Sequence, residues 1–365
     1  MISINVYIKQ FLFRSPGVMN EPNLNLKAGE TTRGTIICTE LEDGSPVSIP
    51  YFVIRGKSKK PVLLINAAIH GEELNGIEVV NRIFEDIKPE EIHGTIVGVP
   101  VVNTLAFRAR SRVDPIDGKN LNRVFPGKKD GTVTERIAYH FFNKFVKKAD
   151  FGIDLHTGSK GHLLVPHPRV RTLSDFIPSL EYPRALGTEF IFQDEGQEGM
   201  LNIEAGKIGV PVVCFEIGVA GVLDAYYIKA GLKGVMNFMK YFGMIKGKPE
   251  IPKQQVLLKG YKEIPSQIGG LFYPYVKAGD VVKKKQIIGV TKSPYTGEKY
   301  FARAPDDCYI VGIRSQPVVR QGTSIAWIMT FEKSNILPPL RSNDLRDLSS
   351  KIISDTVEKG IILRE

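Results

Sequence analysis

The chain has 365 residues, which is long enough for two domains that each bury a hydrophobic core. Its 42% hydrophobic and 24% charged residues are typical of a soluble globular protein. No apolar run approaches the ~20 residues that a membrane-spanning helix needs. The N-terminal residues, Met1 to Lys9, lack the charged region, long apolar region and small-residue cleavage site of a signal peptide. We therefore expect a cytoplasmic protein without a membrane partner.

The formal net charge of +10 comes with basic runs that are scattered along the chain. These runs include Lys57 to Lys60, Lys144 to Lys148 and Lys283 to Lys285. Aromatic residues do not alternate with them as they do on a nucleic-acid-binding surface, so we expect solvated faces and no nucleic-acid partner. The positive field would still attract small anionic substrates.

The cysteines are few and widely separated. Cys38, Cys214 and Cys308 form no CxxC pair and are odd in number. This pattern argues against a disulfide framework and fits a reducing cytoplasm.

The N-terminal and central parts of the chain differ in their patterns. In residues 1–60, a turn signal at Glu42 to Ser45 separates two alternating runs, which predicts a β-hairpin region. From 61 to 250 the pattern becomes strand, loop and helix, repeated. The predicted strands are Val62–Ile69, Gly94–Val102, Phe151–Leu155, Glu189–Gln193 and Val210–Ile217, and the predicted helices are Glu73–Ile87, Thr134–Lys148, Asn202–Ile208 and Tyr226–Phe242. This order predicts an α/β domain whose mixed, largely parallel sheet is flanked by helices.

A linker-like segment, Lys246 to Lys253, separates this domain from a stretch of short runs rich in Gly and Pro. The stretch predicts a small all-β sandwich or barrel domain over residues 254–335. In residues 340–365, Leu345, Leu348 and Ile352 recur at near-helical spacing. We expect a C-terminal helix that docks on the body or on another subunit, which would support a homo-oligomer.

Three predicted strands end in residues that can bind a metal or move a proton. His70-Gly-Glu-Glu73 follows the first strand, His156 closes a later one, and Glu216 closes the last. Ligands of parallel sheets bind at the C-terminal ends of the strands. His70, Glu73 and His156 therefore form a candidate catalytic zinc site with one position left for water.

The remaining carboxylates near these motifs have several interpretations. Glu216 is the candidate general base, although the alternative is that Glu216 binds the metal and Glu73 does not. Asp154 would share a strand face with His156 and could orient its imidazole, or it could be a buried acid that caps backbone groups. Glu72 is expected to point elsewhere.

A long loop-like stretch between Val102 and Thr134 contains several arginines and asparagines. A loop of this length in a compact domain is usually functional. Arg112 and Arg123 are the candidates for polarising an oxyanion and binding a carboxylate, while Arg108 and Arg110 are expected at the surface. Serine hydrolase chemistry is disfavoured because no serine has the setting of a nucleophile elbow.

Five motifs, in this order, resemble the succinylglutamate desuccinylase/aspartoacylase family of the wider zinc carboxypeptidase superfamily. They are His70-Gly-Glu-Glu73, Ser111-Arg112, Asn120-Leu-Asn-Arg-Val-Phe-Pro126, Asp154-Leu-His-Thr-Gly158 and Phe215-Glu-Ile-Gly218. The resemblance covers about residues 50 to 330 and implies a zinc-carboxypeptidase-like fold. The stretch from Arg112 to Asn120 is longer than in the compact aspartoacylases, and the family pattern does not account for the tail beyond about residue 335.

Carried over by motif, the resemblance implies one Zn²⁺ per chain and a defined role for each site residue. The zinc ligands would be His70, Glu73 and His156, with Glu216 as base. Arg112 would polarise the scissile carbonyl, and Asn122 and Arg123 would hold the substrate carboxylate. The β-rich segment would correspond to the biotinyl/lipoyl-like C-terminal domain of these deacylases, which narrows access to the zinc.

The expected function is a zinc-dependent deacylase of a small, anionic N-acyl amino acid or a related amide. A metallocarboxypeptidase that trims peptides, and a non-catalytic zinc-binding protein, are the alternatives. Such a site could also accept cobalt or manganese.

Overall fold

The computed structural model describes residues 17–19, 21–330 and 336–340. The predicted helix within 340–365 lies almost entirely outside these residues. The elements run in the chain as β1 (Gly17–Met19), β2 (Thr31–Glu40), β3 (Pro46–Arg55), β4 (Val62–Ala67), α1 (Asn75–Asp86), β5 (Thr95–Val99), α2 (Thr104–Ala109), α3 (Val133–Lys144), β6 (Phe151–Gly158), β7 (His162–Thr172), α4 (Glu181–Ala185), β8 (Phe190–Glu195), α5 (Leu201–Lys207), β9 (Val212–Val219) and α6 (Ala225–Tyr241). Short 3₁₀ turns lie at Pro89–Glu91, Leu121–Arg123 and Val146–Lys148.

The remaining elements are all strands. They are β10 (Gln255–Lys259), β11 (Lys262–Pro265), β12 (Gly270–Pro274), β13 (Val281–Val282), β14 (Ile287–Lys292), β15 (Lys299–Arg303), β16 (Cys308–Arg314), β17 (Val318–Val319), β18 (Ser324–Thr330) and β19 (Ile336–Leu337).

The large mixed sheet has a parallel centre. Its main path runs β1-β2-β3-β5-β4-β6-β9-β7-β16-β18-β11. Strands β5, β4, β6 and β9 are parallel, whereas β3 and β7 join the two sides of this centre antiparallel. The predicted α/β class is therefore confirmed, and the N-terminal hairpin of β2 and β3 forms one flank of the sheet.

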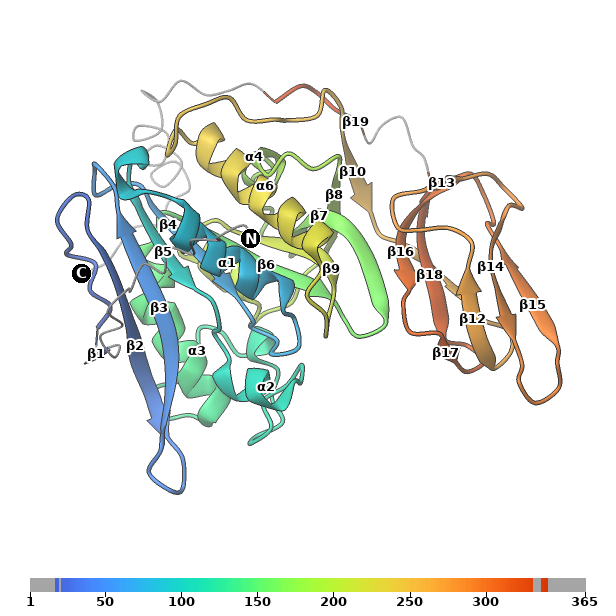
Figure 1. The fold of residues 1–365 in the computed structure, drawn as a ribbon, viewed down its shortest axis with the longest axis horizontal. Coiled ribbons are helices and arrows are strands. Elements are labelled where there is room, and N and C mark those ends of the chain that lie inside the picture. Colours follow the sequence, from blue (N-terminus) through green and yellow to red (C-terminus); the bar gives the residue numbers. More distant parts are fainter. Residues whose placement is uncertain (1–16, 20, 331–335, 341–365) are drawn as a thin grey trace, which may run out of the picture.

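Helices cover both faces of this sheet (Figure 1). On β4, Leu63 and Ile65 join a core with side chains of α1 and α6, whereas Leu64 joins a second core with side chains of α3 and α5. Successive strand residues point to opposite faces, so an almost continuously apolar strand contributes to two cores at once. None of the helices in the described part of the chain is long and apolar enough to cross a membrane.

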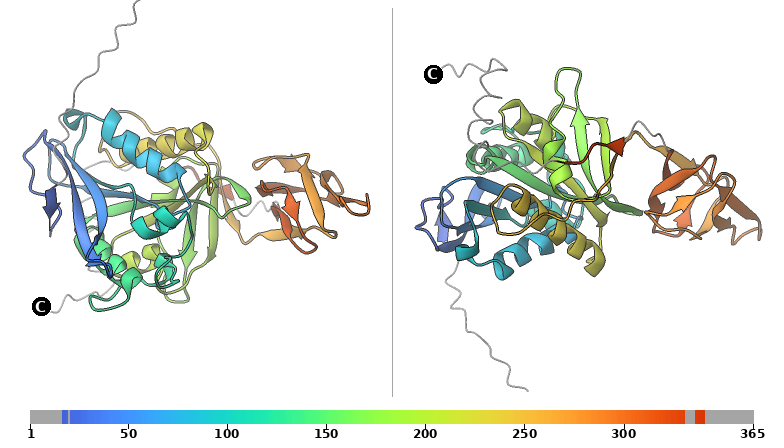
Figure 2. Two further views of the ribbon diagram at one scale, coloured as in Figure 1. Left: turned by 60° about the horizontal axis from the view of Figure 1, so that its bottom comes forward. Right: turned by 90° about the horizontal axis from the view of Figure 1, so that it is seen from above.

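The C-terminal strands form a lobe at one end of the molecule (Figure 2). Strands β11, β13, β16 and β18 pair within the large sheet, while β15, β14, β12 and β17 form a second, four-stranded sheet. Buried side chains from both sheets, among them Phe272, Ile310 and Ile325, make one core between them. This packing is that of a small β-sandwich.

Two strand pairings join the lobe to the α/β body. Strand β16 pairs antiparallel with β7, and β10 pairs parallel with β8. The segment after the predicted linker thus returns to the body before it enters the lobe.

Candidate metal and catalytic site

The candidate site lies where β4, β6 and β9 end. After β4, Ala68 adopts a left-handed conformation (φ 52°), and a tight turn carries His70 and Glu73 toward the start of α1. Gly71 lies against α2, where an added Cβ would come 1.9 Å from the carbonyl carbon of Ala106. Only glycine fits at this point of the turn, and its close packing fixes the two side chains in place.

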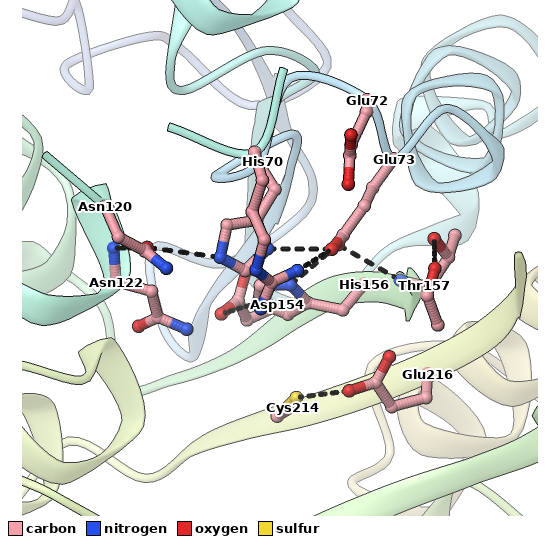
Figure 3. Close-up of polar contacts among 12 residues, drawn as sticks. His70, Glu72, Glu73, Asn120, Asn122, Asp154, His156, Thr157, Cys214 and Glu216 are labelled. Carbon is pink, nitrogen blue, oxygen red and sulfur yellow. Dashed lines mark hydrogen bonds and ion pairs between the residues drawn. The ribbon is translucent and has the colours of Figure 1, made fainter. Parts of the chain in front are cut away.

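The side chain of Glu73 lies between two imidazole rings (Figure 3). Its Oε1 is 2.8 Å from Nδ1 of His70, and its Oε2 is 2.9 Å from Nδ1 of His156. All three side chains are buried, and their potential ligand atoms lie within 4.8 Å of one another. The donor set of two imidazoles and one carboxylate, aimed at one point, fits a catalytic zinc ion.

The outer nitrogens of both rings also have partners. Nε2 of His156 lies 2.7 Å from Oδ2 of Asp154, and Oδ1 of Asp154 accepts a 2.6 Å hydrogen bond from Asn66. Nε2 of His70 lies 3.2 Å from Oδ1 of Asn120. Both rings thus have oxygen partners at both nitrogens, since Glu73 faces the two Nδ1 atoms. A metal bound at Nδ1 would leave each Nε2–H to donate to its own oxygen partner, which fixes the ring.

The buried charges strongly influence one another. Burial alone would raise the pKa of Glu73, but His70 and His156 outweigh it and hold that pKa far below its usual value. For His70, burial dominates and lowers the pKa. For His156, the opposing effect of burial is overcome by Asp154, Cys214 and Glu73, so its pKa is raised. The site therefore favours an ionised Glu73 beside a protonated His156, and a bound cation would replace that proton because a metal-binding imidazole must be neutral.

Glu216 lies on β9 directly beside His156 in the parallel register of β6 and β9. Its side chain is buried, and burial raises its pKa although Arg169 opposes this shift. Oε1 lies 4.0 Å from Sγ of Cys214, a contact visible in Figure 3. Within the described part of the chain, Oε2 has no hydrogen-bond partner. A carboxylate with a raised pKa and one unengaged oxygen suits proton transfer.

The arginine-rich stretch is more ordered than the sequence suggested. Helix α2 occupies its start, with Asn103 as N-cap, and a 3₁₀ turn at Leu121–Arg123 lies near its end. The predicted long loop is thus divided: after α2, two loops at 110–120 and 124–132 are separated by the 3₁₀ turn. Arg108 and Arg110 are exposed, in line with the expectation for both.

Arg112 reaches the metal-binding group, because its Nη1 lies 3.1 Å from Oε1 of Glu73. Asn122 is buried, and its Oδ1 accepts a 2.8 Å hydrogen bond from the backbone of Leu201. Arg123 donates to the carbonyl of Asn122 at 2.6 Å. Its pKa is lowered by burial and then by the nearby charges of Arg171 and Arg112. Two of the predicted arginines therefore lie near each other at the site.

Several partners of the site were not predicted. Asn66 donates a hydrogen bond to Asp154, and the side-chain oxygen of Asn120 faces Nε2 of His70. Arg169 on β7 faces Glu216. Glu72 forms a 3.1 Å ion pair with Lys160 and takes no part in the metal-binding group, as expected. Asn120 belongs to the Asn120-Leu-Asn-Arg motif, and this motif was the sequence feature that could have indicated its place at the site.

The chain is similar to one family model and to several known proteins. The model of the succinylglutamate desuccinylase/aspartoacylase catalytic domain matches residues 59–242. The Nα-acetyl-L-2,4-diaminobutyric acid deacetylase of Halomonas elongata is 29% identical over 301 residues, which cover 79% of this chain and 87% of that protein. The succinylglutamate desuccinylase of Ectopseudomonas mendocina is 27% identical over 177 residues, covering 43% of this chain and 50% of that protein.

Solved structures show the same similarity over most of the chain. The product-bound ectoine utilization protein EutE (DoeB) of Ruegeria pomeroyi superposes with a TM-score of 0.72 and 26% identity, covering 84% of this chain and 98% of that one. An aspartoacylase family protein of Mesorhizobium loti gives a TM-score of 0.71 and 26% identity, covering 85% and 98%. The range matched by the family model, 59–242, includes the strands β4, β6 and β9 that carry the site.

Proposed function

Because the chain belongs to the succinylglutamate desuccinylase/aspartoacylase family, we propose that it is a zinc-dependent deacylase of small N-acyl amino acids. The observation that carries the proposal is the carboxylate of Glu73 held between the imidazoles of His70 and His156, with Glu216 on the neighbouring strand. The relatives named as a deacetylase and a desuccinylase support amide hydrolysis of a small acyl amino acid.

His70, Glu73 and His156 would hold one zinc ion through two nitrogens and a carboxylate oxygen, and Asp154 would orient His156. When bound, zinc supplies Lewis-acid polarisation and lowers the pKa of water for attack on the amide. The fit of the residues to this ion rests on the buried, convergent donor set and on the partners at both outer ring nitrogens.

Glu216 would take a proton from the attacking water and deliver it to the departing amine nitrogen. Its buried carboxylate has a raised pKa, which makes protonation during turnover easier than for an exposed glutamate. Arg112 would stabilise the negative charge that develops on the carbonyl oxygen. Asn122 and Arg123 would hold the substrate carboxylate, a task that suits the guanidinium of Arg123 at the site.

The cellular setting is also a proposal. The cysteines Cys38, Cys214 and Cys308 are free and buried, which supports work in a reducing compartment such as the cytoplasm. The net charge of +10 fits attraction of an anionic substrate.

The test is an activity screen of zinc-loaded, full-length protein. We expect hydrolysis of Nα-acetyl or N-succinyl amino acids and little or no cleavage of blocked dipeptides. The variant Glu216→Gln should lower kcat by roughly 10²–10⁴-fold, the range for general acid–base catalysis, with unchanged zinc content.

The matched control is Glu85→Gln, which alters an exposed glutamate on α1 and should keep full activity. Near-normal turnover by Glu216→Gln would exclude the proposed mechanism. Preferred cleavage of dipeptides would favour a carboxypeptidase, and stoichiometric zinc without any hydrolysis would favour a binding role.

A further inference from the structure

The antiparallel pairing of β7 with β9 brings Arg169 beside the catalytic carboxylate. Arg169 is opposite Cys214, and His167 is opposite Glu216. Directly opposed residues of an antiparallel pair point to the same face of the sheet, as do residues two apart on one strand. Arg169 and Glu216 therefore share one face, as diagonal neighbours.

The two side chains form a buried ion pair. Nε of Arg169 lies 3.8 Å from Oε1 of Glu216, and only 13% and 8% of the two side chains are exposed. On its other side, Nη1 of Arg169 lies 3.5 Å from Oδ2 of Asp194 on β8. A buried guanidinium or carboxylate without a partner is costly, so each of these groups depends on the others.

The charges act in the expected direction. Burial lowers the pKa of Arg169, but Glu216 and Asp194 outweigh it and raise that pKa. Burial raises the pKa of Glu216, and Arg169 provides the largest opposing effect. Arg169 thus favours the ionised form of a carboxylate that its environment would otherwise neutralise.

The contact leaves the reactive end of Glu216 available. The separation of 3.8 Å exceeds a hydrogen bond, and Nε of Arg169 has no hydrogen-bond partner in the described ranges. Oε2 of Glu216 is equally unengaged there. Arg169 therefore attracts the carboxylate by charge without occupying its second oxygen, which a general base needs for the proton it accepts.

We propose that Arg169 is a positioning residue for Glu216, holding the carboxylate in place from the β7 side while Asp194 restrains the guanidinium. This inference rests on the proposed role of Glu216 as general base. Arg169 would act through Glu216 and not on the substrate, so its removal should affect kcat and leave KM nearly unchanged.

The first experiment measures kcat, KM and zinc content of Arg169→Met, with Nα-acetyl-L-2,4-diaminobutyrate as the first substrate tried and the best substrate of the acyl amino acid screen as the second. We expect kcat to fall about 10- to 100-fold, which is less than the loss of the base itself, with KM within about twofold. Arg169→Lys, which keeps the charge, should recover part of kcat.

The matched control is Arg171→Met on the same strand face. Arg171 also lies near Asp194, at 3.7 Å, and its side chain is 14% exposed, so the two arginines are buried to a similar extent. Its ion pair is with Asp194, and its charge lowers the pKa of Glu216 less than that of Arg169 does. We expect a smaller loss of kcat than for Arg169→Met.

A double-mutant cycle separates positioning from a structural role. In the Glu216→Gln background, Arg169→Met should change kcat by less than about twofold, since the group it positions is gone. An equal loss in both backgrounds, or an unchanged kcat for Arg169→Met alone, would overturn the inference. If Arg169→Met does not fold, the same cycle is run with Arg169→Gln, which also removes the charge but keeps a polar side chain. Normal turnover by Glu216→Gln alone would instead remove the proposed base.

Discussion

Oε2 of Glu73 lies 2.9 Å from Nδ1 of His156, although the two residues are 83 positions apart in the chain. The same oxygen accepts a 3.1 Å hydrogen bond from the backbone of Thr157. The contact thus joins the turn after β4 to the end of β6, and the parallel pairing of these strands brings the two together. A metal-binding group built across two strand ends depends on the sheet as a whole.

His156→Ala should abolish stoichiometric zinc binding, because two ligands remain where a catalytic zinc site uses three. The measurement is zinc per chain by mass spectrometry after dialysis. His93→Ala, which changes an exposed histidine, serves as the control and should retain one zinc ion. Full zinc occupancy in His156→Ala would show that the metal binds elsewhere.

Asp154→Asn should weaken zinc binding by roughly 10- to 100-fold while leaving all three ligands in place. The reason is the 2.7 Å contact from Oδ2 of Asp154 to Nε2 of His156, which fixes the ring and makes it more basic. Competition with a chelator of known affinity measures the change. An affinity equal to that of the unaltered protein would mean that Asp154 does not support His156.

Arg123→Met should raise KM by about 10- to 100-fold, the effect of losing a charged hydrogen bond to a substrate carboxylate. We expect kcat to change much less. Steady-state kinetics on the preferred acyl amino acid gives both constants, and exposed Arg108→Met is the comparison. If the effect falls on kcat with KM unchanged, Arg123 acts in the chemical step and not in binding.

The thiols should be inert in the folded protein at pH 8. Burial raises the pKa of Cys38 and of Cys214 to about 12, and that of Cys308 to about 11. A raised pKa keeps these groups as neutral thiols until the pH approaches those values, and the thiolate is the reactive form. Maleimide labelling followed by mass spectrometry should find three fast sites in denaturant and none in native protein. Rapid native labelling of any one would contradict its burial.

Phe238→Ala should destabilise the α/β body by about 3–5 kcal/mol, the usual cost of removing a buried phenylalanine. The ring is fully buried on α6, with its centroid 5.4 Å from that of Phe151 and 4.6 Å from that of Phe242. Urea unfolding followed by circular dichroism measures the shift. Tyr226→Ala, at a position that is 67% exposed on the same helix, should stay within about 0.5 kcal/mol.

The central strands and the metal-binding group were predictable because their signals are local. Apolar runs such as Val62–Ala67 are interpreted as buried strands, and His70 and Glu73 follow one of them directly. Asp154 and His156 are two apart on a strand, which places both on one face without knowledge of the fold.

Strand β7 escaped prediction, and Arg169 with it. The segment His162–Thr172 contains Pro166 and Pro168, which argue against a strand inside a sheet. Strand β7 pairs with β9 and β8, and these long-range contacts cannot be inferred from the local sequence of the segment. Asn66 was missed for a related reason, since an amide inside an apolar run becomes meaningful only when Asp154 is placed beside it.

The pairings of β10 with β8 and of β16 with β7 make one of the two sheets of the C-terminal lobe continuous with the sheet that carries the metal-binding group. A truncated chain that ended near residue 250 would lack β10 and β16. It would leave unpaired backbone groups along the edges of β8 and β7, and such exposed edge strands promote aggregation. We therefore expect that exchanging the lobe between relatives would disrupt the sheet of the α/β body. Insertions or fusions are best placed in exposed turns such as Thr296–Gly297, away from the strands that share the continuous sheet.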